Sequence, residues 1–155
     1  MNNTPVTTSP SFEPQTVNRF IAHVYDQNNN EILPSCVIKS TSRPSFTIPR
    51  PSFTILPDRK TKVYNNLMLV CYEPIKPNIS EVIYNHTDLL LNCIITIETL
   101  DPVGNIIETY KITSARLLSV IPDCLDWSNT GDCCITSLSF EVNSVVYTSH
   151  IQKSP

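Results

Sequence analysis

Alternating apolar and polar positions run through most of the chain and predict a protein built mainly of β-strands. Strands are expected at 19–26, 32–40, 62–73, 93–100, 106–112, 115–121 and 133–147. The first two should form a hairpin, because three asparagines at 28–30 separate them. The run 62–73 is apolar on both faces, so it should lie centrally in a sheet.

One segment has the spacing of a helix. Asn78 can cap its first turn, and Glu81 follows three residues later as in a capping box. The apolar positions of the segment form one stripe, at Ile79, Val82, Ile83 and Leu90. We therefore expect a single helix that covers a sheet, within a β-sandwich or barrel.

Turn residues divide the second half of the chain into two hairpins. The segment 101–105, with Pro102 and Gly104, should join 93–100 to 106–112. The acidic loop 122–132 should join 115–121 to 133–147. Residues 1–17 are polar and contain prolines, as is typical of a loosely ordered arm. The expected organisation is an arm over 1–17, one domain over 18–150 and a tail over 151–155.

A phrase of seven residues occurs twice in succession. Residues 43–49 read RPSFTIP, and residues 50–56 read RPSFTIL. The repeated prolines lack the amide hydrogen that a sheet requires, so this stretch fits only an edge strand or an extended arm. Its role should therefore lie at a boundary of the domain.

Composition narrows the class of protein. The chain has 155 residues with 41% hydrophobic residues, enough for one domain with its own core. The net charge of −3 and the lack of clustered Lys and Arg argue against binding to nucleic acid. No basic, apolar leader and no membrane-length apolar run is present, so we expect a soluble protein made in a cytoplasm.

Residues that could carry chemistry are present but poorly spaced. None of the six cysteines forms a C-x-x-C pair, and Cys71, Cys93 and Cys134 fall in apolar runs where reduced core thiols are expected. Asp123, Asp126 and Asp132 could hold a cation, but the spacing favours a solvated turn. Nucleotide-binding and hydrolase motifs are missing. We expect no catalysis, cofactor or metal.

Several short motifs occur in a recognisable order. Asn18-Arg19-Phe20 opens the first strand, Leu125-Asp126-Trp127 precedes a polar loop, and Phe140-Glu141-Val142 lies in the last strand. With them, residues 16–147 resemble the tail tube proteins of contractile-tailed bacteriophages. The chain departs from such proteins in two ways, because Ser114-Ala115 stand where they often have glycine and no proline follows Leu117-Leu118. These departures leave room for a specialised protein of the tube end.

The resemblance implies a fold and a function. The fold would be mainly β with one helix, a tail-tube-like sandwich or barrel that closes into a ring-forming channel wall on oligomerisation. Six copies would form a ring, and stacked rings would form the conduit for DNA ejection in the virion tail, assembled in the host cytoplasm. Partners would be further copies of the chain, the tail sheath, and baseplate and tail-terminator proteins, with DNA passing unbound and no membrane involved.

Three alternatives remain. The chain could be a tube-like baseplate or tail-terminus protein, or the inner tube of a type VI secretion system. A carbohydrate-binding β-sandwich is more distant and would use Trp127 beside Asp126.

Two groups of residues are candidates for assembly. Polar residues that interrupt apolar strands should line the channel, where an acidic wall would repel DNA phosphates: Thr96, Glu98, Glu108, Ser139 and Glu141. Ordinary solvated strand faces are the alternative. In the family that this chain resembles, the link between the second strand and the long third strand is an extended loop that reaches a neighbouring subunit or ring. Residues 43–57 lie in that link, and its candidate contacts are Arg43, Phe46, Ile48, Arg50, Phe53 and Ile55. The alternative is a private hairpin on its own domain.

Overall fold

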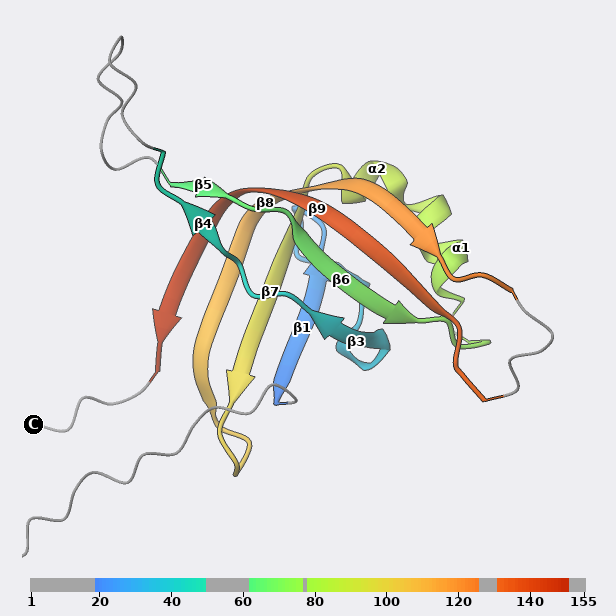
Figure 1. Cartoon of the computed structure of the whole chain (residues 1–155), viewed down its shortest axis with the longest axis horizontal. Coiled ribbons are helices and arrows are strands. Elements are labelled where there is room, and N and C mark those ends of the chain that lie inside the picture. Colours follow the sequence, from blue (N-terminus) through green and yellow to red (C-terminus); the bar gives the residue numbers. More distant parts are fainter. Residues whose placement is uncertain (1–18, 50–61, 77, 126–130, 151–155) are drawn as a thin grey trace, which may run out of the picture.

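Seven strands form one antiparallel sheet in the order β2-β1-β7-β8-β9-β6-β3 (Figure 1). The computed structural model describes residues 19–49, 62–76, 78–125 and 131–150. In chain order the strands of this sheet are β1 (Phe20–Tyr25), β2 (Glu31–Leu33), β3 (Ile38–Thr41), β6 (Leu67–Tyr72), β7 (Cys93–Leu100), β8 (Ile106–Pro122) and β9 (Ile135–Ser149). The sheet curls into a half-barrel, so the expected mainly β architecture is confirmed.

A second, two-stranded sheet pairs β4 (Phe46–Thr47) with β5 (Val63–Tyr64). It follows on from the β3–β6 pair, and β5 lies beside β9 just before β6 begins (Figure 1). Its partners are antiparallel, with Phe46 opposite Tyr64 and Thr47 opposite Val63. We call this element the ribbon.

The predicted helix is present as two short segments, α1 (Ile79–Asn85) and α2 (Thr87–Leu90). The Asn78 side chain accepts a hydrogen bond of 3.0 Å from the Glu81 amide, so the predicted cap is confirmed. Ile79, Ile83 and Leu90 are buried, as the apolar stripe predicts. No helix among the described residues has the length and apolar character needed to cross a lipid bilayer.

The core lies between the inner face of the curled sheet and these helices. Its largest fully buried side chains include Phe140, Leu33, Leu67, Leu69, Ile95 and Leu138. Along β7 the side chains alternate between buried and half-buried, as expected for a strand with one face on the core. Every strand of this sheet therefore has an inner face and an outer face, and the pairing register assigns residues to each.

Two predicted strands are divided in the structure. Pro34 has no amide hydrogen and is followed by a 3-10 turn, Ser35–Val37. Only Glu31–Leu33 therefore pairs with β1, while Ile38–Thr41 crosses to pair with β6. The predicted strand 62–73 is interrupted between β5 and β6. The Asn65 amide still donates to the Ser45 carbonyl, which extends the pairing of the ribbon by one residue before β6 begins. Its second half, β6, lies between β9 and β3 but buries only one face.

Two other predicted strands are joined in the structure. Residues 106–112 and 115–121 belong to one strand, β8, and the break expected between them is a pair of register shifts around Ser114. Such irregularities bend a strand without requiring glycine, which accounts for the serine there. The strand expected from Cys133 begins only at Ile135, and Cys134 is exposed, so its assignment to the core was wrong. Cys71 and Cys93 are buried as predicted.

Candidate assembly surface

The two longest strands extend past their other neighbours at opposite ends. β8 and β9 pair along most of their lengths, from Glu108 opposite Ser149 to Pro122 opposite Thr136. β7 pairs with β8 only as far as Ala115, and β6 pairs with β9 only as far as Phe140. Within the described residues, 116–122 of β8 and 141–149 of β9 therefore each have one edge without a partner strand. We call these segments the two overhangs.

Unpaired strand edges present backbone donors and acceptors that another strand can satisfy. The overhangs lie on opposite sides of the β8–β9 pair and at opposite ends of it. Exposed apolar side chains accompany the β8 overhang, where Leu118 is 49% and Ile121 is 60% exposed. Val146, on the β9 overhang, is 52% exposed. This surface can therefore bind through both its backbone and its side chains.

Four of the five predicted channel residues lie on the outer face of the sheet. Thr96 is opposite Lys111, and Glu98 is opposite Thr109. Glu141 is opposite Arg116, and Ser139 is opposite Met68. The residues that alternate with them, Ile95, Ile97, Phe140 and Val142, are all buried in the core. Whether this outer face lines a channel remains a prediction.

Glu108 lies on the inner face instead. It is opposite Thr99, which is buried and donates a hydrogen bond of 3.2 Å to the Glu108 carboxylate. The Tyr147 hydroxyl donates a hydrogen bond of 3.1 Å to the other carboxylate oxygen of Glu108. The centroids of the Tyr110 and Tyr147 rings are 5.2 Å apart. The hydrogen bond to Glu108 raises the pKa of Tyr147, and burial raises the pKa of Tyr110. Glu108 and Glu98 therefore cannot line the same wall.

Sequence reasoning missed two basic residues of the outer face, Lys111 and Arg116. Both are exposed, and each pairs across the sheet with a predicted channel residue. The outer face of β7, β8 and β9 is thus a mixture of charges and not the acidic surface expected from the glutamates. Only the register of β8 could have revealed this, because it decides which residues face outward.

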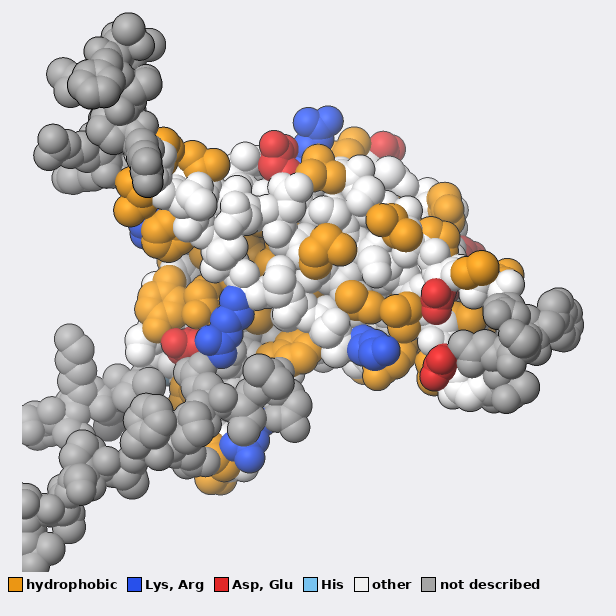
Figure 2. All heavy atoms as spheres, viewed as in Figure 1, with side chains coloured by type: hydrophobic (Ala, Val, Ile, Leu, Met, Phe, Trp, Pro, Cys, Tyr) orange, Lys and Arg blue, Asp and Glu red, His pale blue; other side chains and the backbone are white. Residues whose placement is uncertain are grey.

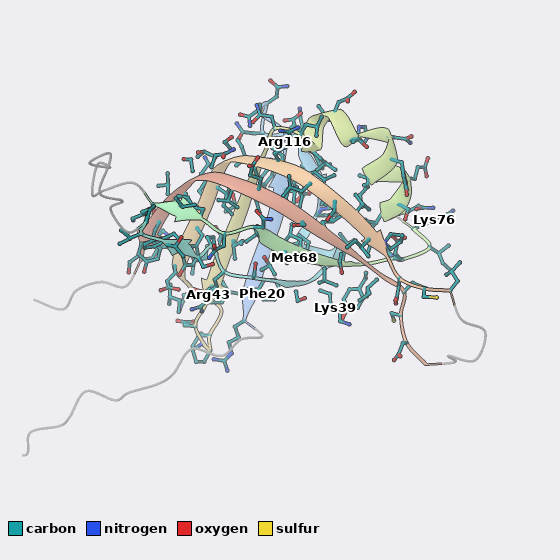
Figure 3. All side chains as sticks on the ribbon, turned by 45° about the horizontal axis from the view of Figure 1, so that its top comes forward. Phe20, Lys39, Arg43, Met68, Lys76 and Arg116 are labelled. Carbon is teal, nitrogen blue, oxygen red and sulfur yellow. The ribbon has the colours of Figure 1, made fainter. Side chains whose placement is uncertain are left out.

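Part of the outer face is apolar. Met68 and Tyr72 of β6 are 40% and 39% exposed, and Lys39, beside β6 on the neighbouring strand β3, places its Nζ atom 5.6 Å from the centroid of the Tyr72 ring (Figure 3). In the space-filling view, apolar side chains are scattered over the visible face and also gather around the ribbon (Figure 2). Scattered apolar side chains are normal on a protein surface, whereas apolar side chains that gather in one place, as around the ribbon, are typical of a surface that binds partners.

The ribbon contains the first copy of the repeated phrase. The rings of Phe46 and Tyr64 meet edge to face with centroids 6.0 Å apart, and Lys62 Nζ lies 4.7 Å from the Phe46 centroid. Phe46 remains 45% exposed and Ile48 66% exposed. Arg43 lies just before the ribbon (Figure 3), and the remaining predicted arm residues, Arg50, Phe53 and Ile55, lie outside the described residues.

The motif residues behind the family resemblance have mixed locations. Phe20 packs against the core, and Phe140 and Val142 are buried in it. Leu125 is 86% exposed beyond the end of β8. Asn18, Asp126 and Trp127 lie outside the described residues. Three of the motif residues, Phe20, Phe140 and Val142, therefore contribute to the hydrophobic core.

The two buried cysteines, Cys71 and Cys93, are not poised to act as nucleophiles. Burial raises the pKa of Cys71 to about 11 and that of Cys93 to about 12, so both remain thiols at neutral pH. Across the described ranges, no three His, Cys, Asp or Glu side chains converge on a possible metal position. Of the predicted cation loop, Asp126 lies outside those ranges.

Comparison with known proteins gives a fold but no close relative. No family model and no curated protein matches the sequence. Among solved structures, a chain of the sheath/tube terminator of PVC, an extracellular contractile injection system, matches with a TM-score of 0.63 and 16% identity, covering 90% of this chain and 100% of that one. A chain of the PVC sheath-tube complex matches with a TM-score of 0.57 and 18% identity, covering 88% and 92%.

A third match is to an Hcp protein. Hcp1 of E. coli EAEC 042 aligns with a TM-score of 0.55 and 9% identity, covering 85% of this chain and 92% of that one. These coverages mean that the whole domain is shared and not a single hairpin. The chain therefore has the fold of the tube-type proteins of contractile injection systems and of Hcp.

Proposed function

We propose that this protein polymerises into rings that stack as the tube of a contractile tail. The observation that carries the proposal is the pair of overhangs on β8 and β9. Because they lie on opposite sides and ends of the sheet, the β8 overhang of one subunit can pair with the β9 overhang of the next. Such head-to-tail contacts use two different surfaces and close into a ring when the rotation allows.

Ring closure would remove the free edges in the way that closure of a β-barrel does. Six copies per ring follow from the family resemblance. The shared fold with chains of sheath-tube and terminator assemblies supports a tube-type role and the proposed sheath, baseplate and terminator partners. The role is structural, in a virion tail, with no catalytic step.

In the assembled ring, the outer face of β7, β8 and β9 would form the channel wall. Its residues would be Thr96, Glu98, Ser139 and Glu141 together with Lys111 and Arg116. Each basic side chain there lies opposite a neutral or an acidic residue, Lys111 opposite Thr96 and Arg116 opposite Glu141. The wall therefore lacks a continuous row of cationic side chains, which would bind phosphates through counterion release. DNA would pass such a wall without being held.

One alternative position in the tail is supported by a specific match. The aligned chain from the PVC sheath/tube terminator structure is covered over its full length. A terminator would form single rings that end a tube, whereas a main tube protein would form long rods.

Electron microscopy of the purified protein in negative stain tests the proposal. Stacked rings or hollow rods are expected for the main tube and isolated rings for a terminator. Dispersed globules at every concentration and salt condition would contradict both. The decisive variant is Leu118→Lys/Ile121→Lys, which charges the β8 overhang at two exposed positions and should leave a folded monomer.

Val103→Lys is the matched control. Val103 is 86% exposed in the turn between β7 and β8, outside both overhangs, so this variant should assemble normally. Normal rods from the overhang variant would rule out strand pairing as the ring contact. Circular dichroism should show unchanged strand content in both variants.

A further inference from the structure

Within the ribbon, residues 62–65 contact three consecutive residues of the first repeated phrase, 45–47. The Asn65 amide donates to the Ser45 carbonyl at 2.9 Å, and Asn65 Nδ2 donates to Ser45 Oγ at 2.9 Å. Phe46 receives the ring of Tyr64 and the Lys62 ammonium. The third residue, Thr47, pairs with Val63. Residues 62–65 thus form a short receptor strand for the tripeptide Ser-Phe-Thr.

The chain carries this tripeptide a second time. Residues 43–48 and 50–55 are identical, Arg-Pro-Ser-Phe-Thr-Ile, so Ser52-Phe53-Thr54 repeats Ser45-Phe46-Thr47. Each contact of the ribbon described above uses a phrase residue that recurs. The receptor strand therefore has no side-chain means of distinguishing the two copies.

We propose that residues 62–65 bind either copy of the phrase from the same chain, so that the ribbon exists in two registers seven residues apart. Short pairings are weakly specified in register, and here two registers would offer the same contacts. This inference concerns the isolated subunit and does not depend on the proposed tube.

Chain geometry allows both registers. Ser42 is fixed to β6 by two hydrogen bonds, from its amide to the Met68 carbonyl and from the Met68 amide to its Oγ atom. With the first copy bound, residues 48–62 form the connection to β5. With the second copy bound, 55–62 would form that connection and 43–51 would loop out after Ser42.

Loop closure explains which copy the structure shows. The first register closes one loop, whereas the second closes two, and each closure costs conformational entropy. The first copy therefore dominates in the free subunit. Any partner that withdraws the first copy would leave the ribbon intact with the second copy in place.

Engineered disulfides can detect both registers. Directly opposite residues of an antiparallel pair have Cα atoms within disulfide range. We would compare Thr47→Cys/Val63→Cys, for the first register, with Thr54→Cys/Val63→Cys, for the second. Ser52→Cys/Val63→Cys is the offset control, because in the second register Ser52 would lie opposite Asn65.

Each pair would be oxidised at high dilution with oxidised glutathione, and the linked peptides would be identified by mass spectrometry. Both matched pairs should link within monomers, and the first should link faster. Adding Phe46→Ala removes an aromatic pair and a cation–π contact from the first register, so linkage of 54 to 63 should become about tenfold faster. Linkage no faster than the offset control, or unaffected by Phe46→Ala, would overturn the proposal.

Linkage of 54 to 63 between two chains would also overturn it, because the occupant would then be a neighbour's phrase. Hydrogen exchange of residues 62–65 gives a second readout. Protection should persist in Phe46→Ala and in Phe53→Ala and should be lost in the double variant. Equal loss in Phe46→Ala and in the double variant would show that the second copy never binds.

Discussion

Arg116 and Glu141 lie directly opposite each other on β8 and β9, on the outer face of the sheet. Cross-strand pairs of opposite charge stabilise a sheet modestly, and like charges in the same positions destabilise it. Both residues are exposed, so solvent limits the strength of the pair.

We expect Arg116→Glu to lower the free energy of unfolding by up to about 1 kcal/mol, because it places two carboxylates opposite each other. The reversed pair, Arg116→Glu/Glu141→Arg, should recover most of this loss. Urea unfolding of the two single variants and the double variant gives the coupling, which should shrink at high salt. Additive effects at low salt would show that the side chains do not interact.

Two turns of the protein are built in the same way and predict a loss of stability in acid. The Asp26 carboxylate accepts hydrogen bonds from Asn28 and Asn30, and the Asp101 carboxylate accepts them from Val103 and Asn105. The fourth residue of each turn has positive φ, 62° at Asn29 and 97° at Gly104.

In both turns the asparagine side chain, followed by its backbone amide, lowers the pKa of the aspartate. A pKa lowered by folding adds stability above the pKa of the unfolded chain, about 3.9, and this stability is lost as the pH falls through the folded value. We expect Asp101→Asn to flatten the decline in melting temperature between neutral pH and pH 3. An unchanged decline in that variant would contradict the hydrogen-bonded turn.

Core and ribbon aromatics should differ sharply in their effect on stability. Phe140 is fully buried, so Phe140→Ala should cost about 3–5 kcal/mol of unfolding free energy. Phe46 is 45% exposed in the ribbon, and Phe46→Ala should barely change the main unfolding transition. Chemical denaturation monitored by circular dichroism tests both variants, and a large loss from Phe46→Ala would mean that the ribbon belongs to the cooperative core.

The cysteines should divide into two reactivity classes. Cys36, Cys124, Cys133 and Cys134 are exposed and free, whereas Cys71 and Cys93 are buried thiols with raised pKa values. At pH 8 a thiol reagent such as DTNB should label the exposed group quickly and the buried pair only as the protein unfolds. All six should react at once in denaturant. Fast labelling of Cys93 in the native protein would contradict its place in the core.

Local sequence signals predicted the parts of the fold that depend on neighbouring residues. The cap at Asn78 and the hairpin around Gly104 follow from side chains a few positions apart, and both were predicted correctly. The strand breaks at Pro34 and after Asn65 were both missed. The missing amide hydrogen of Pro34 is a local signal, whereas the change from β5, paired with β4, to β6, paired with β9 and β3, depends on distant partners that no local pattern reveals.

The candidate surface was harder to predict, because a strand residue changes face with every register shift. Glu98 and Glu108 look equivalent in the sequence, yet the connection between β7 and β8, with a shift at Leu100, places them on opposite faces. For the same reason Lys111 and Arg116 were missed. Irregular positions such as Ser114 carry no distinctive residue type, so these faces become known only from the paired sheet.

The strand order also dictates when the fold can form during synthesis. β1 must wait for β7, since Phe20 pairs with Thr99, and β6 must wait for β9, since Leu67 pairs with Phe140. The nascent N-terminal half therefore leaves the ribosome with two strands that each still lack one of their two partners, since only β2 and β3 are already present to pair with β1 and β6. Distant pairings of this kind are slow to form and expose strand edges to aggregation. The β8–β9 hairpin, made last from adjacent segments, completes the sheet.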